Sequence, residues 1–107
     1  MPTERIPRVG RPERPLDAGG PLSRFARDLR LLRAAAGYPS YRVLAAQALY
    51  SPSVLSTAAS GSSLPSLQVT LAYAGACGGD IGEWRRRWEA TAVALARPRS
   101  LRPLAAG

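Results

Sequence analysis

Apolar residues recur at three- and four-residue spacing through most of the chain, a pattern that predicts amphipathic helices. The first such segment covers residues 22–36, with Pro21 suited to its first turn and Gly37 suited to its C-terminal cap. Its apolar positions are Leu22, Phe25, Ala26, Leu29, Leu32 and Ala36, and the opposite, basic face carries Arg24, Arg27, Arg30 and Arg33.

Three serine residues mark the starts of further helices, because a serine side chain satisfies a free N–H group of the first helical turn. Pro52 is also favourable as a first helical residue. The predicted helices are 41–48 after Ser40, 52–59 after Ser51 and 67–77 after Ser66.

A fifth helix is predicted at 81–96, after the break at Gly78-Gly79 and the capping residue Asp80. Its apolar stripe consists of Ile81, Trp84, Trp88, Ala92 and Leu95, with Arg85, Arg86 and Arg87 mostly beside it. The sequence has no alternating β-branched run and no hairpin dipeptide. It therefore predicts an all-α fold of five helices in one domain at 21–96.

The two ends of the chain have a different composition. Residues 1–20 are rich in Pro, Gly and charge and predict a disordered basic arm, and residues 97–107 predict a flexible basic tail. In a polyproline II helix, arginines at every third position share one side. The arm is then either a basic stripe for a polyanion or a solvated tail. The arginines in question are Arg5, Arg8, Arg11 and Arg14.

Basic residues outnumber acidic residues by 15 to 7, which gives a formal charge of +8 and a pI near 11.2. Such a charge favours a polyanionic partner such as DNA, RNA or an anionic membrane surface. All 15 basic residues are Arg, and Ala, Gly and Pro are abundant, which is typical of a GC-rich genome. Codon supply can account for part of the Arg excess, which weakens the inference from charge.

Several kinds of chemistry are missing from the sequence. The chain has no His and one cysteine, Cys77, so His-dependent catalysis, His-ligated metals and an intrachain disulfide are excluded. No acidic pair is forced together, and Gly78-Gly79 is a helix break rather than a phosphate loop. No apolar run reaches the length of a membrane span, and the N-terminal arginines are not followed by the apolar segment of a signal peptide. We expect a cytoplasmic protein that is not an enzyme and has no cofactor, no metal, no small-molecule substrate and no membrane contact.

Residues 40–67 resemble the helix-turn-helix core of XRE-family (lambda-repressor-like) regulators without a gap. The matching positions are the caps Ser40 and Ser51, the inward-facing Leu44, Ala45, Ala48, Leu55 and Ala58, the turn residue Tyr50, and the exit residues Gly61, Pro65 and Ser66. The segment that follows looks like the actinobacterial branch of this family, so that the resemblance covers about 23–90. It implies a five-helix domain whose third helix enters the major groove of DNA.

The resemblance also implies which residues contact double-stranded DNA. Arg42 is well placed for a phosphate, and the hydroxyl of Tyr41 can donate beside it. The implied groove-facing and flanking positions are Ser51, Pro52, Ser53, Val54, Ser56 and Thr57, and the implied phosphate contacts after them are Ser62 and Ser63. Because the fifth helix often borders the dimer interface in such domains, Trp84 and Trp88 are either core anchors or partner contacts.

The third helix departs from the family pattern in a way that leaves two functions open. It has no Arg, Lys, Gln or Asn, so bidentate contacts to base edges are missing and direct readout is expected to be weak. Leu49 occupies a turn position that is usually Gly, and we expect an altered turn there. The chain is then either a DNA-binding transcriptional regulator, acting as a dimer, or a helix-turn-helix fold reused for protein interaction or self-assembly with weak or no DNA binding.

Overall fold

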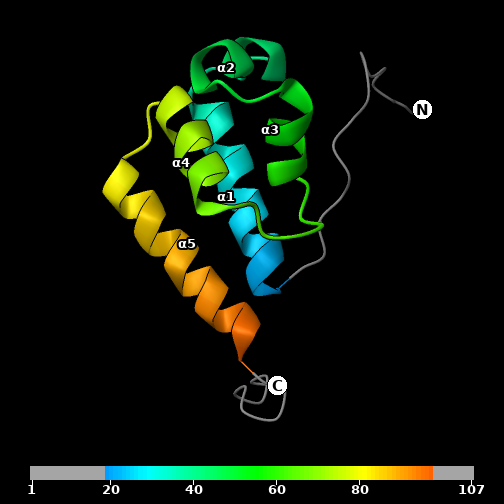
Figure 1. The fold of residues 1–107 in the computed structure, drawn as a ribbon, viewed down its shortest axis with the longest axis vertical. Helices are drawn as coiled ribbons and strands as arrows, with labels where there is room; N and C mark the ends of the chain where they lie inside the picture. Colours follow the sequence, from blue (N-terminus) through cyan, green and yellow to red (C-terminus); the bar gives the residue numbers. More distant parts are fainter. Residues whose placement is uncertain (1–18, 98–107) are drawn as a thin grey trace, which may run out of the picture.

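Five α-helices make up most of residues 19–97, the range that the computed structural model describes (Figure 1). No strand occurs within that range, so the predicted all-α class is confirmed. The predicted bounds are correct to within one residue at each helix end. The helices are α1 (Pro21–Ala35), α2 (Tyr41–Ala48), α3 (Pro52–Ala58), α4 (Leu67–Ala76) and α5 (Ile81–Ala96). The four arginines of the predicted arm lie outside the described residues, as does almost all of the predicted tail.

Side-chain caps begin four of the five helices, as the sequence predicted. The Oγ atoms of Ser40, Ser51 and Ser66 each accept a hydrogen bond of 3.1 Å from the backbone N–H three residues later. Asp80 does the same for α5, where its Oδ1 accepts from the N–H of Glu83 at 2.8 Å. Each such cap stabilises a helix by about 1 kcal/mol, which matters most for the short helices α2 and α3.

Glycine residues in the left-handed conformation end α1 and α4. Gly37 has φ +95°, and the N–H of Tyr38 bonds the carbonyl oxygen of Arg33 at 3.0 Å. Gly78 has φ +80°, and the N–H of Gly79 bonds the carbonyl oxygen of Ala74 at 2.7 Å. Both ends are Schellman motifs, which satisfy the last helical carbonyls and turn the chain sharply.

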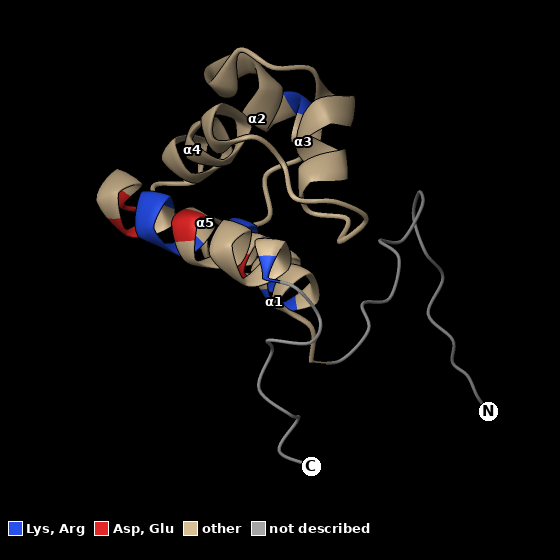
Figure 2. Ribbon diagram, turned by 60° about the horizontal axis from the view of Figure 1, so that its bottom comes forward, with Lys and Arg blue, Asp and Glu red and all other residues tan. Residues whose placement is uncertain are grey.

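Helix α4 contacts each of the other four helices, and the remaining strong contacts pair α1 with α5 and α2 with α3. Figure 2 shows the consequence: α1 and α5 lie side by side beneath α2, α3 and α4. We refer to α1 with α5 as the α1–α5 layer and to residues 41–76 as the α2–α4 half. The two parts share one core.

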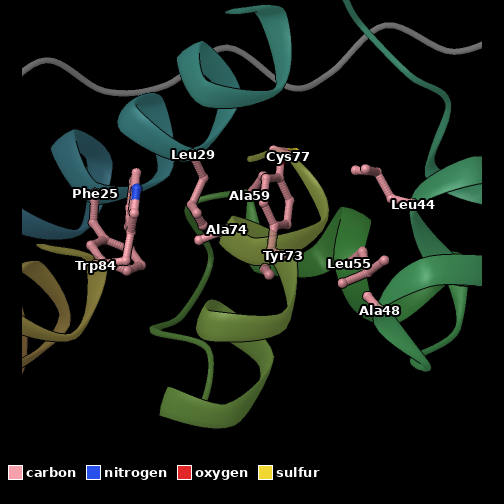
Figure 3. Close-up of a cluster of buried hydrophobic side chains, with 11 residues drawn as sticks. Phe25, Leu29, Leu44, Ala48, Leu55, Ala59, Tyr73, Ala74, Cys77 and Trp84 are labelled. Carbon is pink, nitrogen blue, oxygen red and sulfur yellow. The ribbon is translucent and has the colours of Figure 1, made fainter. Parts of the chain in front are cut away.

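That core runs continuously from one part to the other (Figure 3). Phe25 and Trp84 meet edge to face, with ring centroids 5.7 Å apart, and join α1 to α5. Tyr73 of α4 is fully buried at the centre. Small residues complete the far end, where α2 and α3 cross. The buried residues at that end are Leu44, Ala48, Leu55, Ala58 and Ala59.

Two arginines of the basic face that the sequence predicts for α1 are half-buried. The Nε of Arg30 donates to the carbonyl oxygen of Ala59 at 2.8 Å, and the Nε of Arg33 donates to that of Pro39 at 2.8 Å. Both side chains are half-buried because they reach backbone carbonyls near the end of α3 and before α2. They tie α1 to the α2–α4 half. The predicted apolar stripe of α5 also begins differently, because Ile81 is exposed.

Candidate functional site

Leu49, between α2 and α3, has a left-handed backbone conformation, although the sequence predicted an altered turn there. Leu49 has φ 65° and ψ 25°, and its N–H donates to the carbonyl oxygen of Ala45 at 3.0 Å. Its side chain is 87% exposed, so the position gains almost nothing from burial. Left-handed backbone costs a residue with a Cβ about 1–2 kcal/mol. The expectation of an altered turn is therefore wrong: the packing of α2 against α3 imposes the conformation that glycine would adopt freely.

One side of α3 is buried and the other is exposed. Leu55 and Ala58 face the core, where they meet Leu44 and Ala48 of α2. The residues predicted to face a partner are all exposed, and they are Ser51, Pro52, Ser53, Val54, Ser56 and Thr57. The structure thus gathers these candidate residues on one accessible surface at the α2–α3 end of the molecule.

The two neighbouring residues at the start of α2 have different surroundings. Arg42 is exposed, beside the Ser40 cap. Tyr41 is half-buried, its hydroxyl lies 3.4 Å from that of Tyr73, and the Arg33 guanidinium carbon lies 4.2 Å from its ring centroid. The hydroxyl of Tyr41 therefore lies beside that of Tyr73, and its role as a phosphate donor stays a prediction. Arg42 keeps the exposure that this role requires.

The serine loop after α3 is tied to the end of that helix. The Oγ of Ser60 donates to the carbonyl oxygen of Thr57 at 2.7 Å and lies 2.8 Å from the Oγ of Ser62. The N–H of Ser62 also donates to Ser60 Oγ, at 3.2 Å. Ser62 and Ser63 are both exposed. The loop therefore holds its hydroxyls at the rim of the α3 surface.

A groove with a volume of about 310 Å³ runs between α3, this loop and the start of α4. It is lined by Ser53, Val54, Thr57, Ala58, Ser63, Pro65, Ser66 and Val69. Its lining contains aliphatic groups and hydroxyls but no charged side chain. No local pattern predicts Pro65 and Val69 as residues of this site, because only the tertiary fold brings them beside α3.

Charge is distributed unequally between the two parts of the molecule. Arg42 is the one charged residue in the stretch 34–79. In Figure 2 the blue and red segments gather on α1 and α5, whereas α2, α3 and α4 are almost entirely tan. The candidate surface is therefore nearly uncharged, and the cations of the described residues lie mainly on the α1–α5 layer.

Ion pairs join the two helices of that layer. Arg87 of α5 bonds Asp28 of α1 at 2.9 Å and Glu83 of its own helix at 2.8 Å. Hydrogen bonds from Arg87 and Arg86 hold the pKa of the Glu83 carboxyl below its usual range. These side chains are largely exposed, so the pairs add little to the free energy of unfolding. Their main consequence is that they hold these charged side chains in place on the surface of the layer.

The two tryptophans of α5 lie at different depths. Trp84 is 5% exposed and belongs to the core, which leaves little of its ring for a partner. Trp88 is half-buried, and its Nε1–H donates to the carbonyl oxygen of Pro65 at 2.8 Å. This bond fixes the loop that borders the groove. Both rings therefore have structural contacts within the domain.

Two titratable side chains, Tyr73 and Cys77, are buried in the core. Burial, with the hydroxyl of Tyr41 as a second cause, raises the pKa of Tyr73 far above its ordinary value. Burial also raises the pKa of the Cys77 thiol, which disfavours its thiolate form. Within residues 19–97, no group of His, Cys, Asp or Glu side chains is placed to hold a metal ion. None of the described helices has the length and hydropathy to cross a membrane.

Comparisons with known proteins add no assignment to this picture. No protein-family model, no curated protein and no solved structure matches the chain. What the α3 surface binds must therefore be inferred from its own shape and chemistry.

Proposed function

We propose that this chain is a DNA-binding protein of the helix-turn-helix type, with a lambda-repressor-like arrangement, and that it acts in transcriptional regulation. The proposal rests on α3, which is exposed on one side and buried on the opposite side. An α-helix presented in this way fits the width of the major groove. Local details support the same motif: Ser51 caps α3, and Leu49 takes the left-handed turn conformation.

Contacts to the DNA backbone are expected from α2 and from the serine loop. Arg42 supplies a guanidinium for a phosphate, and Ser62 and Ser63 supply hydroxyl and N–H donors. The outward side chains of α3 are too short for bidentate contacts to bases. Affinity from this surface is therefore modest, and the regulator gains selectivity by binding as a dimer, with two third helices on one duplex.

Fluorescence anisotropy at low salt, with random and genomic duplexes, tests this proposal. Thr57→Glu places a carboxylate on the exposed side of α3, and we expect it to weaken binding at least tenfold. Val93→Glu adds the same charge at a residue of α5 that is 64% exposed, and it serves as the matched control. We expect the control to bind as the unchanged chain does.

Two results would contradict DNA binding through α3: no binding to any duplex at low salt, or equal losses in the two variants. Regulation further requires selectivity. A genomic site preferred over random duplex by at least about 10³-fold would support a regulator. Binding without any such preference would limit the proposal to nonspecific association.

A second candidate function rests on the near absence of charge on the same surface. With Arg42 as the one charged residue in 34–79, the α3 surface is inexpensive to desolvate against protein. In that case the helix-turn-helix fold serves as an interaction or self-assembly module. Sedimentation of the free chain separates these outcomes, because self-assembly through α3 would be lost in Thr57→Glu without any DNA present.

A further inference from the structure

The groove beside α3 is lined by both aliphatic side chains and hydroxyl groups. Carbon atoms come from Val54 and Ala58 of α3 and from Pro65 and Val69 at the start of α4. Val54 is 39% exposed, so its methyl groups are within reach of a ligand. The groove holds about 310 Å³, enough for a methyl group together with the edge of the ring that bears it. Its ligand must therefore present an apolar group of small size.

The hydroxyls of the lining indicate a ligand that carries polar groups as well as this apolar group. Ser66 already accepts the N–H of Val69 as the α4 cap. The hydroxyls of Ser53, Thr57 and Ser63 form no hydrogen bond with other residues of the 19–97 range and are exposed. A purely apolar partner would remove their water without replacing it, at a cost for each hydroxyl. A ligand with both a methyl group and hydrogen-bond acceptors satisfies the whole lining.

The edge of thymine in the major groove has this combination. It presents the C5-methyl group beside the O4 acceptor, and it is the one base edge there with a methyl group. DNA also complements the charge of the chain, with Arg42 on the same half of the molecule and a formal charge of +8 overall. Guanine and adenine are normally selected by bidentate Arg, Gln or Asn side chains, and α3 has none of these.

On the basis of the DNA-binding function proposed above, we propose that the groove between α3 and α4 reads thymine methyl groups. The protein then prefers A·T-rich duplexes. Val54 and Val69 pack on the C5-methyl group, while Ser53 and Thr57 donate to neighbouring acceptors on the base edges. Specificity comes from the contact of a methyl group with an apolar surface, and single hydroxyl bonds to bases add only a small part.

Replacing thymine by uracil tests this proposal, because the two bases differ only in the C5-methyl group. Anisotropy titrations compare alternating A·T and A·U duplexes of equal length under the same salt. We expect the A·U duplex to bind about fourfold more weakly for each methyl group that reaches a groove. The reverse change is informative as well: 5-methylcytosine adds a methyl group at the same major-groove position of a G·C duplex, and we expect it to strengthen binding.

A pair of variants places the effect in the groove. Val54→Ser removes the central aliphatic group of the groove, and we expect the ratio of A·T to A·U affinity to fall to about one. Val43→Ser makes the same change on α2, at a side chain that is 51% exposed and does not line the groove. We expect this control to keep the ratio of the unchanged chain.

The possible failures of the two proposals are distinguishable. Equal affinity for A·T and A·U duplexes, with binding to both, overturns the thymine-methyl proposal and leaves DNA binding intact. A ratio that survives in Val54→Ser also overturns it, since another surface would then sense the methyl group. Absence of binding to every duplex overturns both proposals, and sedimentation of the same sample then shows whether a second copy covers the groove.

Discussion

The α1–α5 layer and the α2–α4 half differ in the side chains that pack inside them and in the charge of their surfaces. The layer has large aromatic contacts inside and ion pairs outside, such as Phe25 against Trp84 and Arg87 with Asp28. The α2–α4 half has short capped helices, small residues at the helix crossing and a surface of hydroxyl and aliphatic groups. The candidate binding surface thus lies on the part with one charged residue.

The net charge of a chain does not show which of its surfaces binds a partner. A formal charge of +8 predicts a polyanionic partner, yet most cations of the described residues lie on the layer away from α3. At physiological ionic strength the interaction of exposed charges is screened within about 8 Å. The chemistry of the α3 surface therefore has to be judged from its own residues.

Among the substitutions considered, the free energy of unfolding should change most where α3 packs against the core. Leu55 is fully buried between α3 and the rest of the core, and Leu55→Ala should lower the free energy of unfolding by about 3 kcal/mol through lost burial and a cavity. The neighbouring exposed Ser56→Ala should change it by less than about 0.5 kcal/mol. Urea denaturation followed by circular dichroism measures both. Similar effects of the two variants would mean that α3 is not docked as described.

A buried hydroxyl at the centre of the molecule gives a smaller effect of the opposite sign. Thr70 is fully buried in α4, and its Oγ1 has no hydrogen-bond partner within residues 19–97. Thr70→Val keeps the shape and removes the unsatisfied group, so the free energy of unfolding should rise by about 1–2 kcal/mol. A lower melting temperature for this variant would show that the hydroxyl is satisfied in solution.

The turn between α2 and α3 offers a further gain in stability. Leu49→Gly relieves the left-handed strain, and the greater freedom of glycine in the unfolded chain offsets part of the gain. The net expectation is an increase in the free energy of unfolding of about 0.5–1 kcal/mol, with DNA binding unchanged. Leu49→Ala serves as the control, since it keeps a Cβ and should bring no such increase. Destabilisation by Leu49→Gly would show that the exposed leucine side chain makes contacts of its own.

The weakest contribution to stability comes from Glu83 in the α1–α5 layer, and it depends on pH. The pKa of Glu83 is lowered in the folded state, so its bonds to Arg87 and Arg86 stabilise the fold above the unfolded pKa of about 4.3. This contribution is lost as the pH falls through the lower, folded pKa. Glu83→Gln should therefore show a shallower loss of melting temperature between about pH 5 and pH 3. Parallel acid profiles for the two proteins would rule out this linkage.

Helix positions were predictable from the sequence because their causes are local. Ser40, Ser51, Ser66 and Asp80 accept bonds from residues three positions away, and the apolar spacing of each helix reflects its own geometry. The glycines after α1 and α4 act locally as well. Such signals do not depend on how the helices pack, which is why the predicted bounds differ from the observed ones by no more than one residue.

Other features depend on contacts between distant segments and could not be predicted. The periodicity of α1 assigns Arg30 and Arg33 to a polar face, but their long side chains reach carbonyls of Ala59 and Pro39 that only the fold brings near. Tyr41 is drawn inward by Tyr73 of α4 in the same way. The groove joins Val54 to Val69 across two helices, and no local pattern marks this meeting.

The number of DNA phosphates that the α3 side of the molecule neutralises shows whether this side binds DNA. The logarithm of DNA affinity falls with the logarithm of salt concentration by about 0.9 for each neutralised phosphate. We therefore predict that Arg42→Gln reduces this slope by about 0.9, whereas Arg27→Gln, an exposed position on the α1–α5 layer, leaves it unchanged. A slope that is reduced by Arg27→Gln and not by Arg42→Gln would contradict DNA binding through α3. It would assign DNA binding to the α1–α5 layer instead.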